Sequence, residues 1–252
     1  MRAGHALVVA LGGLDPTGGA GLVRDRLTLA RAWPEVAWRG VVTAWTQQGD
    51  GQPARARPVS AQVLARVLAG LPRPAAVKLG LVPTGLVEVV ASYVGSLGVP
   101  VVLDPVLRAS DGGDLGADAS SLLKLAQHVT LVTPNRLEAA ALTGREVFDP
   151  GLGAALHERL PHTALLLKDG HGADPTTVCD EWWLSGGCVR LTRGRVRGPD
   201  VRGTGCALAA AITGALAVGI SLAEAVPLAV GWLDEARQRT VLGPDGRFHL
   251  WP

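Results

Sequence analysis

Short runs of apolar residues recur along the chain at intervals that predict buried β-strands. Each run ends at polar or turn residues, and most are rich in Val and Leu. Because the runs are continuous and do not alternate with polar residues, they are typical of strands covered on both faces. The predicted strands are Ala6–Leu11, Val41–Thr43, Ala75–Leu79, Val99–Leu103, Val129–Val132 and Ala164–Leu167.

Helical spacing of apolar residues fills the intervals between these runs. It is found at Leu22, Leu27 and Leu29, and over Val59–Leu71, Leu86–Leu97 and Leu122–Ala126. Strands that alternate with helices over short connections predict a parallel sheet with helices on its faces, an α/β fold. Right-handed crossovers then bring the carboxyl ends of the strands to one edge of the sheet, where ligands bind in such folds.

The last third of the chain departs from this alternation. Thr177–Arg195 has two short β-prone runs around Ser185–Gly187, which predicts a hairpin at the sheet edge. One helix is expected to begin near Gly203, and another to run from Leu222 to about Arg239 with Ser221 as its N-cap. No internal repeat or low-complexity linker is evident.

Two segments raise the question of a membrane or an export signal. The stretch 203–223 has 21 residues without a charge, but it contains four glycines and its apolar part is mostly alanine. Transfer into lipid would gain little, so we expect a buried helix. The apolar run near Met1 continues into a glycine-rich turn and not into a small-residue cleavage site, which favours a first strand over a signal peptide.

Composition narrows the class of protein. The chain has 252 residues, 48% of them hydrophobic, which is enough for a large core, and we expect one domain over residues 1–252. A net charge of +2 and an aromatic content of 4% argue against nucleic-acid binding and against an anionic membrane surface. Cys179, Cys188 and Cys206 lack metal-site spacing, so reduced thiols in a cytoplasm are expected.

Two glycine-rich segments lie where a helix begins. Asp15–Gly21 follows the first strand, so its backbone N–H groups could approach a ligand, although a plain tight turn is an alternative. Gly203, Thr204, Gly205 and Cys206 open the most apolar helix. The helix N-terminus could stabilise phosphoryl charge and favour the Cys206 thiolate, whereas the other interpretation is a helix start with a buried thiol.

Polar residues follow three of the predicted strands. Asp104 ends one strand, and Asn135 and Glu138 follow the next, so carboxylate and amide oxygens suited to Mg²⁺ reach the same edge. Alternatively, Asn135 caps the next helix, with Glu138 completing a capping box. Lys168 ends a third strand and could counter phosphate charge, or could simply be solvated. Together with the glycine segments, these residues predict phosphoryl transfer from a magnesium nucleotide.

Longer motifs make the chain similar to a known family. It resembles the hydroxymethylpyrimidine and phosphomethylpyrimidine kinases of thiamine biosynthesis, within the ribokinase-like superfamily. The resemblance spans nearly the whole chain, and TPNxxEA followed by GTGC is its most specific part. The motifs are GLDPTGGAG (13–21), TAWTQQ (43–48), KLGL (78–81), VLDPV (102–106), TPNRLEAAALTG (133–144), LLLKDGH (165–171), RGTGCALAAAITGALAVG (202–219) and GPDGRFHLW (243–251).

The resemblance implies a fold, a reaction and a site. The fold would be a three-layer α/β/α ribokinase-like domain with a mostly parallel sheet and an edge hairpin. The reaction would be ATP- and Mg²⁺-dependent phosphorylation of 4-amino-5-hydroxymethyl-2-methylpyrimidine and of its monophosphate. Matched by position, the anion hole would be formed by Gly203, Thr204 and Gly205, and the base would be Cys206. The pyrimidine would be bound by Gly13, Asp15, Asp25 and Gln48. ATP would be bound by Asn135 and Lys168, and the metal by Asp104 and Glu138.

Several positions depart from the family pattern. Leu14 replaces a small hydroxylated residue, Arg202 a histidine and Ala207 a threonine. The loop after VLDPV lacks the usual lysine, for which Arg108 is a candidate substitute. Asp169 replaces a glycine close to the expected polyphosphate, where like charge should weaken binding.

These departures leave three hypotheses for the function. The first is an active hydroxymethylpyrimidine or phosphomethylpyrimidine kinase. The second is a catalytically weakened relative that binds the pyrimidine as a sensor or partner subunit, and the third is a kinase for pyridoxal or another hydroxymethyl heterocycle. The resemblance also suggests a homodimer, and Gly49–Pro58 and Ala109–Gly116 are both candidate lids.

Overall fold

A computed structural model describes residues 6–47, 54–108, 112–170, 172 and 174–251. Its main feature is a nine-stranded sheet in the order β3-β2-β1-β4-β5-β6-β7-β8-β9. The six strands from β2 to β7 pair in parallel, and β3, β8 and β9 are antiparallel additions at the two edges. This is the expected mostly parallel α/β sheet. Its strands are β1 (Leu7–Leu14), β2 (Ala37–Gln47), β3 (Arg55–Pro58), β4 (Ala76–Leu79), β5 (Val101–Leu103), β6 (Leu131–Val132), β7 (Ala164–Leu167), β8 (Thr177–Leu184) and β9 (Gly187–Gly194).

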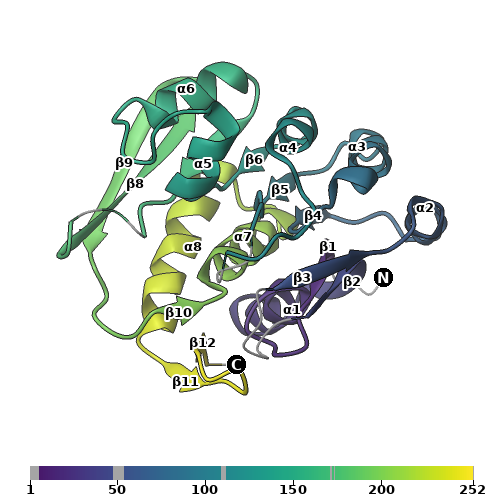
Figure 1. The fold of residues 1–252 in the computed structure, drawn as a ribbon, viewed down its shortest axis with the longest axis horizontal. Coiled ribbons are helices and arrows are strands. Elements are labelled where there is room, and N and C mark those ends of the chain that lie inside the picture. The colour runs from purple at the N-terminus through teal and green to yellow at the C-terminus, as the bar shows by residue number, and fades with distance from the viewer. Residues whose placement is uncertain (1–5, 48–53, 109–111, 171, 173, 252) are drawn as a thin grey trace.

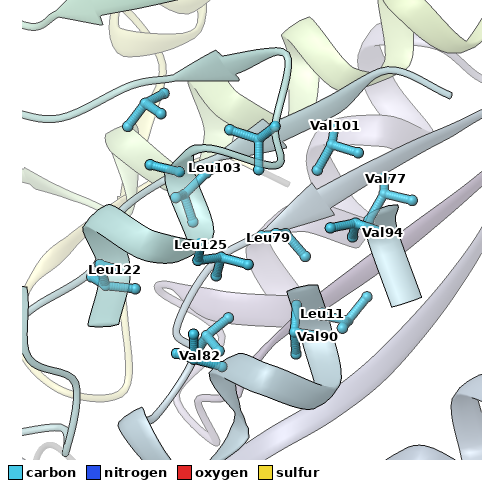
Figure 2. Packing of buried hydrophobic residues seen from close by; sticks show 14 of the residues in the cluster. Leu11, Val77, Leu79, Val82, Val90, Val94, Val101, Leu103, Leu122 and Leu125 are labelled. Atoms are coloured by element: carbon cyan, nitrogen blue, oxygen red, sulfur yellow. The ribbon is translucent and has the colours of Figure 1, made fainter. Parts of the chain in front are cut away.

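Helices cover both faces of this sheet, as Figure 1 shows, so the three-layer prediction is confirmed. The side chains of the central strands alternate between the two layers, because successive residues of a strand point to opposite faces. Leu11, Val77 and Leu79 pack against α3 and α4 in one apolar cluster (Figure 2). The helices are α1 (Gly21–Ala32), α2 (Ala61–Ala69), α3 (Val87–Gly95), α4 (Ala119–Ala126), α5 (Arg136–Thr143), α6 (Leu152–Arg159), α7 (Thr204–Ala217) and α8 (Leu222–Arg237), with a 3-10 turn at Thr84–Leu86.

Helix α7 forms the centre of the opposite layer. Every residue from Ala207 to Ala217 is buried, in a cluster that includes the even-numbered strand residues Val8, Ala76 and Val102. Its many alanines allow the helix to lie close to the sheet. The stretch 203–223 is therefore a buried helix followed by a turn, as expected. No helix in the described part of the chain is long and apolar enough to span a membrane.

The edges of the sheet differ from the prediction on one side only. At one edge β8 and β9 form the expected hairpin. At the other, β2 is longer than the predicted Val41–Thr43, and Arg55–Pro58 is strand β3 where a loop was expected. The loop prediction was wrong because the polar residues and the proline of β3 do not give the apolar pattern of a strand. The strand forms because it pairs antiparallel with the end of β2. Residues 49–53 of the candidate lid 49–58 lie outside the described residues.

A small second sheet follows the hairpin and was not predicted. It consists of β10 (Val201–Arg202), β12 (Phe248–Leu250) and β11 (Thr240–Leu242), in that order, and lies away from β8 and β9 in Figure 1. Ser221 is the N-cap of α8 as predicted, but its hydroxyl bonds to the Glu224 carboxylate at 2.6 Å and makes no cap bond to the backbone. The small sheet brings the chain's C-terminal segment beside the start of α7.

Candidate active site

A cavity of 1070 Å³ opens at the carboxyl ends of the parallel strands. Successive residues of a strand point to opposite faces of the sheet. Lys78, Asp104 and Lys168 therefore point to the face covered by α7, as do the buried apolar residues two positions before each of them. The structure thus brings most of the predicted residues together. Those in the cavity wall are Gly13, Asp15, Asp104, Asn135, Glu138, Lys168, Gly203, Thr204, Gly205 and Cys206.

The start of α7 forms a tight turn against the first loop. Gly203 has a φ of +79°, and a Cβ at this position would lie 2.0 Å from the carbonyl oxygen of Gly19. A Cβ on Gly205 would lie 3.0 Å from Lys168 Nζ. Gly203 is therefore required for the close approach to Gly19, whereas Gly205 leaves room for the Lys168 ammonium group. The turn places the unpaired N–H groups of the helix beside this ammonium group.

Gly203→Ala is expected to destabilise the fold by about 2 to 3 kcal/mol, from left-handed strain plus displacement of the Gly19 carbonyl. Gly219→Ala is a matched control, because its φ is +89° but no atom lies within 4 Å of its Cβ position. The control should lose only about 1 kcal/mol. Urea unfolding of both variants would measure the difference, and equal losses would contradict the role of the Gly19 contact.

The loop from Asp15 to Gly21 is organised by its own aspartate. Asp15 Oδ1 accepts hydrogen bonds from Thr17 N at 3.0 Å and Thr17 Oγ1 at 2.9 Å, and Oδ2 accepts one from Ala20 N at 3.0 Å. The side chain is buried and also pairs with Arg202. Asp15 lies in the cavity wall as predicted, but its carboxylate is already used to hold the loop.

An ion pair joins two of the predicted strand-end residues. Lys168 Nζ lies 2.9 Å from Asp104 Oδ1. The backbone N–H of Lys168 donates to Pro134 O at 2.8 Å, and a bridge to Asn135 continues the pairing of β6 with β7. Burial alone would raise the pKa of Asp104, but Lys168 and Lys78 outweigh it and hold that pKa below its ordinary value.

Cys206 lies in the cavity wall between this ion pair and the first loop. Its thiol hydrogen-bonds to Asp104, and the Gly21 backbone N–H donates to its sulfur. Burial raises the pKa of Cys206 to about 12, with Asp104 and Asp25 adding to the rise and Lys78 opposing it. The expectation that the thiolate of Cys206 is favoured was therefore wrong, because burial and two carboxylates raise the pKa by more than Lys78 and the Gly21 N–H lower it.

Asn135 and Glu138 form a reciprocal capping box at the start of α5. Asn135 Oδ1 accepts from Glu138 N at 2.9 Å, and Glu138 Oε2 accepts from Asn135 N at 2.8 Å. The alternative interpretation, in which Asn135 caps the helix and Glu138 completes a capping box, is therefore confirmed. Both residues also line the cavity. Burial raises the pKa of Glu138 to about 7, with Asp104 adding to the rise and Lys168 opposing it.

Asp104 and Glu138 are compatible with a nucleotide-borne magnesium ion. Within the described residues there is no group of three or more His, Cys, Asp or Glu side chains that could hold a metal. Mg²⁺ usually keeps several waters and is bound through one or two carboxylates plus substrate phosphates. Asp104 is close enough to raise the pKa of Glu138 through its charge, so the two carboxylates form a donor set that suits such an ion.

The main residue that the sequence analysis missed is Lys78. It was included in an apolar strand, yet its ammonium lies 3.0 Å from the Asp25 carboxylate, with the two side chains 1% and 0% exposed. Burial would lower the pKa of Lys78, but Asp25, Cys206 and Asp104 raise it above its ordinary value. A lysine inside a continuous apolar run was the available signal, because a buried ammonium requires a partner.

Three predicted site residues lie outside the described cavity wall. Asp25 is fully buried on α1 and pairs with Lys78, so it does not line the cavity and its expected contact with the pyrimidine is not supported by the geometry. Gln48 lies outside the described residues. Asp169 was expected to repel the polyphosphate, but its carboxylate pairs with Arg136 and accepts from Cys179 N at 3.4 Å. The charge of Asp169 is therefore balanced by Arg136 outside the cavity wall, and its effect on nucleotide binding stays a prediction.

Arg108 and Arg202, which depart from the family pattern, both line the cavity. Arg108 forms an isolated antiparallel bridge with Asp114, and the side chain of Arg202 is nearly buried. Residues 109–111 of this candidate lid lie outside the described residues. A Cβ on Gly113 would lie 2.2 Å from Ala54 O, so the described ends of the two candidate lids contact each other.

Solved structures share this fold. The pyridoxal kinase of Staphylococcus aureus in complex with ADP superposes with a TM-score of 0.85 at 22% identity, covering 97% of this chain and 92% of that one. A phosphomethylpyrimidine kinase from Clostridium difficile gives a TM-score of 0.72 at 25% identity, covering 92% and 99%. The ribokinase-like architecture expected from the motifs is therefore confirmed.

Sequence comparison identifies the family. The model of the phosphomethylpyrimidine kinase family matches residues 15–247. The hydroxymethylpyrimidine/phosphomethylpyrimidine kinase of Rhizobium meliloti is 32% identical over 98% of both chains. The matched region contains every residue of the cavity wall named above except Gly13. The chain belongs to the phosphomethylpyrimidine kinase family.

Proposed function

We propose that the protein is a single-domain kinase that transfers the γ-phosphoryl group of ATP to 4-amino-5-hydroxymethyl-2-methylpyrimidine, to its monophosphate, or to both. The observation that carries the proposal is the juxtaposition of the Gly203–Cys206 turn with the Lys168–Asp104 pair in one cavity. Helix N–H groups and an ammonium are the groups that stabilise a transferring phosphoryl group. The Rhizobium meliloti relative, which the chain matches over 98% of its length, is named a hydroxymethylpyrimidine/phosphomethylpyrimidine kinase, and this activity fits the arrangement.

The reaction assigns a role to each group around the turn. The acceptor hydroxyl oxygen forms the new bond to the γ-phosphorus, and the bond from phosphorus to the bridging oxygen of ADP breaks. The hydroxyl proton passes to the Cys206 sulfur, which accepts it in the thiolate form. The N–H groups of Gly203, Thr204 and Gly205 stabilise the charge on the transferred group. Lys168 neutralises charge on the phosphates, and Asn135 lies beside it.

Asp104 and Glu138 would hold a magnesium ion carried by the nucleotide. When bound, such an ion neutralises phosphate charge that develops during transfer. The two carboxylates then serve as its protein ligands, and Lys168 lies 2.9 Å from Asp104 to balance their charge. Cys179, Cys188 and Cys206 are free thiols, which fits a reducing cytoplasm.

The alternative of a weakened, pyrimidine-binding relative is less well supported. It rested on the missing loop lysine, Arg202 and Asp169. The side chains of Arg202 and Asp169 have carboxylate or guanidinium partners that neutralise them, and Arg108, the candidate substitute for the lysine, lines the cavity. A pyridoxal kinase remains the second candidate for the acceptor, since Staphylococcus aureus pyridoxal kinase has the same fold. We expect a homodimer, as the family resemblance suggests, and sedimentation analysis would test it.

Product analysis tests the proposal. Purified protein is incubated with ATP and Mg²⁺ and with hydroxymethylpyrimidine, its monophosphate or pyridoxal in parallel. The pyrimidine mono- or diphosphate should appear, and reactions without acceptor or with excess EDTA serve as controls. Preferential phosphorylation of pyridoxal would transfer the assignment to the second candidate, and binding of the pyrimidine without any product would support the weakened relative.

A further inference from the structure

Arg202 is the centre of a buried polar network beside the cavity. Its Nη2 lies 3.1 Å from Asp15 Oδ2, and its Nη1 lies 2.7 Å from Asp245 Oδ2 and donates to Thr17 Oγ1 at 3.0 Å. The exposed fractions of the Arg202, Asp15 and Asp245 side chains are 5%, 2% and 1%. One guanidinium thus joins the first loop to the C-terminal segment.

The C-terminal segment is itself held against the loop. Asp245 Oδ1 lies 2.8 Å from His249 Nε2. The His249 ring occupies the space beside Gly19, where a Cβ would lie 2.6 Å from Nε2. His249 pairs with Arg202 in the register of β12 and β10. The loop, strand β10 and the segment from Asp245 to His249 are therefore interlocked.

This network ends at the groups that carry out the proposed transfer. Gly203 directly follows Arg202 and contacts the carbonyl of Gly19. At the other end of the loop, the Gly21 backbone N–H hydrogen-bonds to the Cys206 sulfur. The two nucleotide residues, Asn135 and Lys168, are instead joined to each other across β6 and β7.

Arginine suits this position because its planar fork can bind two carboxylates at once. Lysine would keep the charge but present it at a single point, so it could not reproduce the three contacts. Arg202 replaces the family's histidine, a difference that the sequence analysis took as a sign of weakened activity. In the structure the replacement comes with a carboxylate partner in the C-terminal segment, Asp245.

We propose that Arg202, anchored by Asp245, is a positioning residue that holds the Asp15–Gly21 loop against the start of α7 and thereby determines how well the acceptor, but not the nucleotide, is used. The inference rests on the proposed kinase function for its kinetic consequence. Its structural consequence, an ordered first loop, does not depend on any activity.

The kinetic test compares Arg202→Gln, Arg202→Lys and Asp245→Asn with wild type. Each should lower kcat/KM for the acceptor about 10-fold, because small displacements of a positioning loop reduce productive alignment, while KM for ATP stays within about 2-fold. Adding Asp245→Asn to Arg202→Gln should cause little further loss, since both act through one network. The matched control is Asp234→Asn, which removes a 2.7 Å ion pair with Arg193 on the far hairpin and should leave both parameters unchanged.

Hydrogen exchange provides a readout that is independent of catalysis. The Thr17 and Ala20 amides, which donate to Asp15, should exchange faster in the Arg202 and Asp245 variants than in wild type or Asp234→Asn. Unchanged exchange, full rescue by Arg202→Lys, or an equal rise in KM for ATP and acceptor would overturn the proposal. If wild type phosphorylates no pyrimidine, the proposed function fails, and the exchange data alone decide whether Arg202 positions the loop.

Discussion

Cys206→Ala is expected to lower kcat by about 10²- to 10⁴-fold, the usual contribution of a positioned proton acceptor, while the protein remains folded. The thiol contacts the Asp104 carboxylate and the Gly21 backbone N–H at the point where α7 begins. Removing it takes away a proton acceptor but only one heavy atom of packing. Steady-state kinetics together with a thermal melt would separate the two effects. Full activity in the variant would exclude Cys206 as the base.

The pH dependence gives a second test of the same residue. Because the pKa of Cys206 is about 12, the thiolate fraction rises about tenfold with each pH unit below that value. We expect kcat/KM to increase with pH above neutrality in wild type and to lose this rise in Cys206→Ala. Cys179→Ala is the matched control, since Cys179 is also a partly exposed free thiol but lies on β8, and it should behave like wild type.

Lys78→Met is expected to destabilise the fold by about 3 to 5 kcal/mol, which is a large share of the stability of an ordinary domain. The reason is that methionine fills much of the space of the lysine but leaves the fully buried Asp25 carboxylate without its partner at 3.0 Å. Urea unfolding at neutral pH would measure the loss. The exposed Lys124 on α4 provides the control, and Lys124→Met should change stability by less than about 0.5 kcal/mol.

The loss of stability caused by Lys78→Met should become smaller as the pH is lowered. Burial already raises the pKa of Asp25 to about 6 with Lys78 present, and the loss of the ammonium removes the group that limits this rise. A group whose pKa is higher in the folded state than in the unfolded state stabilises the fold fully when the pH lies below its pKa in the unfolded state. This stabilisation is lost as the pH rises through its pKa in the folded state. The variant should therefore be less impaired at pH 5 than at pH 8.

A second substitution at Asp25 should compensate for the loss of Lys78. Lys78→Met combined with Asp25→Leu replaces both charges by apolar groups, and such replacements of buried ion pairs are often neutral or stabilising. The double variant should recover most of the stability that Lys78→Met loses. A double variant as unstable as the single one would mean that Lys78 acts through packing and not through Asp25.

Much of the fold could be predicted from the sequence because its signals are local. The continuous apolar runs around Val77 and Leu165 need no distant partner to be recognised as strands buried on both faces. The glycines at 186 and 187 mark the turn of the edge hairpin, and the uncharged, alanine-rich stretch after Gly203 marks a buried helix. The site residues at the strand ends were found for the same reason, since parallel strands all end at one edge.

What the sequence by itself determined is therefore the layered α/β architecture, the edge at which the cavity lies and the chemical types gathered there. Only the tertiary structure decided which of these groups are already paired: Lys78 with Asp25 across 53 positions, and Arg202 with Thr17 across 185. It also decided that Arg55–Pro58 is a strand and that the C-terminal segment joins the first loop. The physical reason is that apolar periodicity reports burial along the chain, whereas the partner of a buried charge is set by distant elements meeting in space.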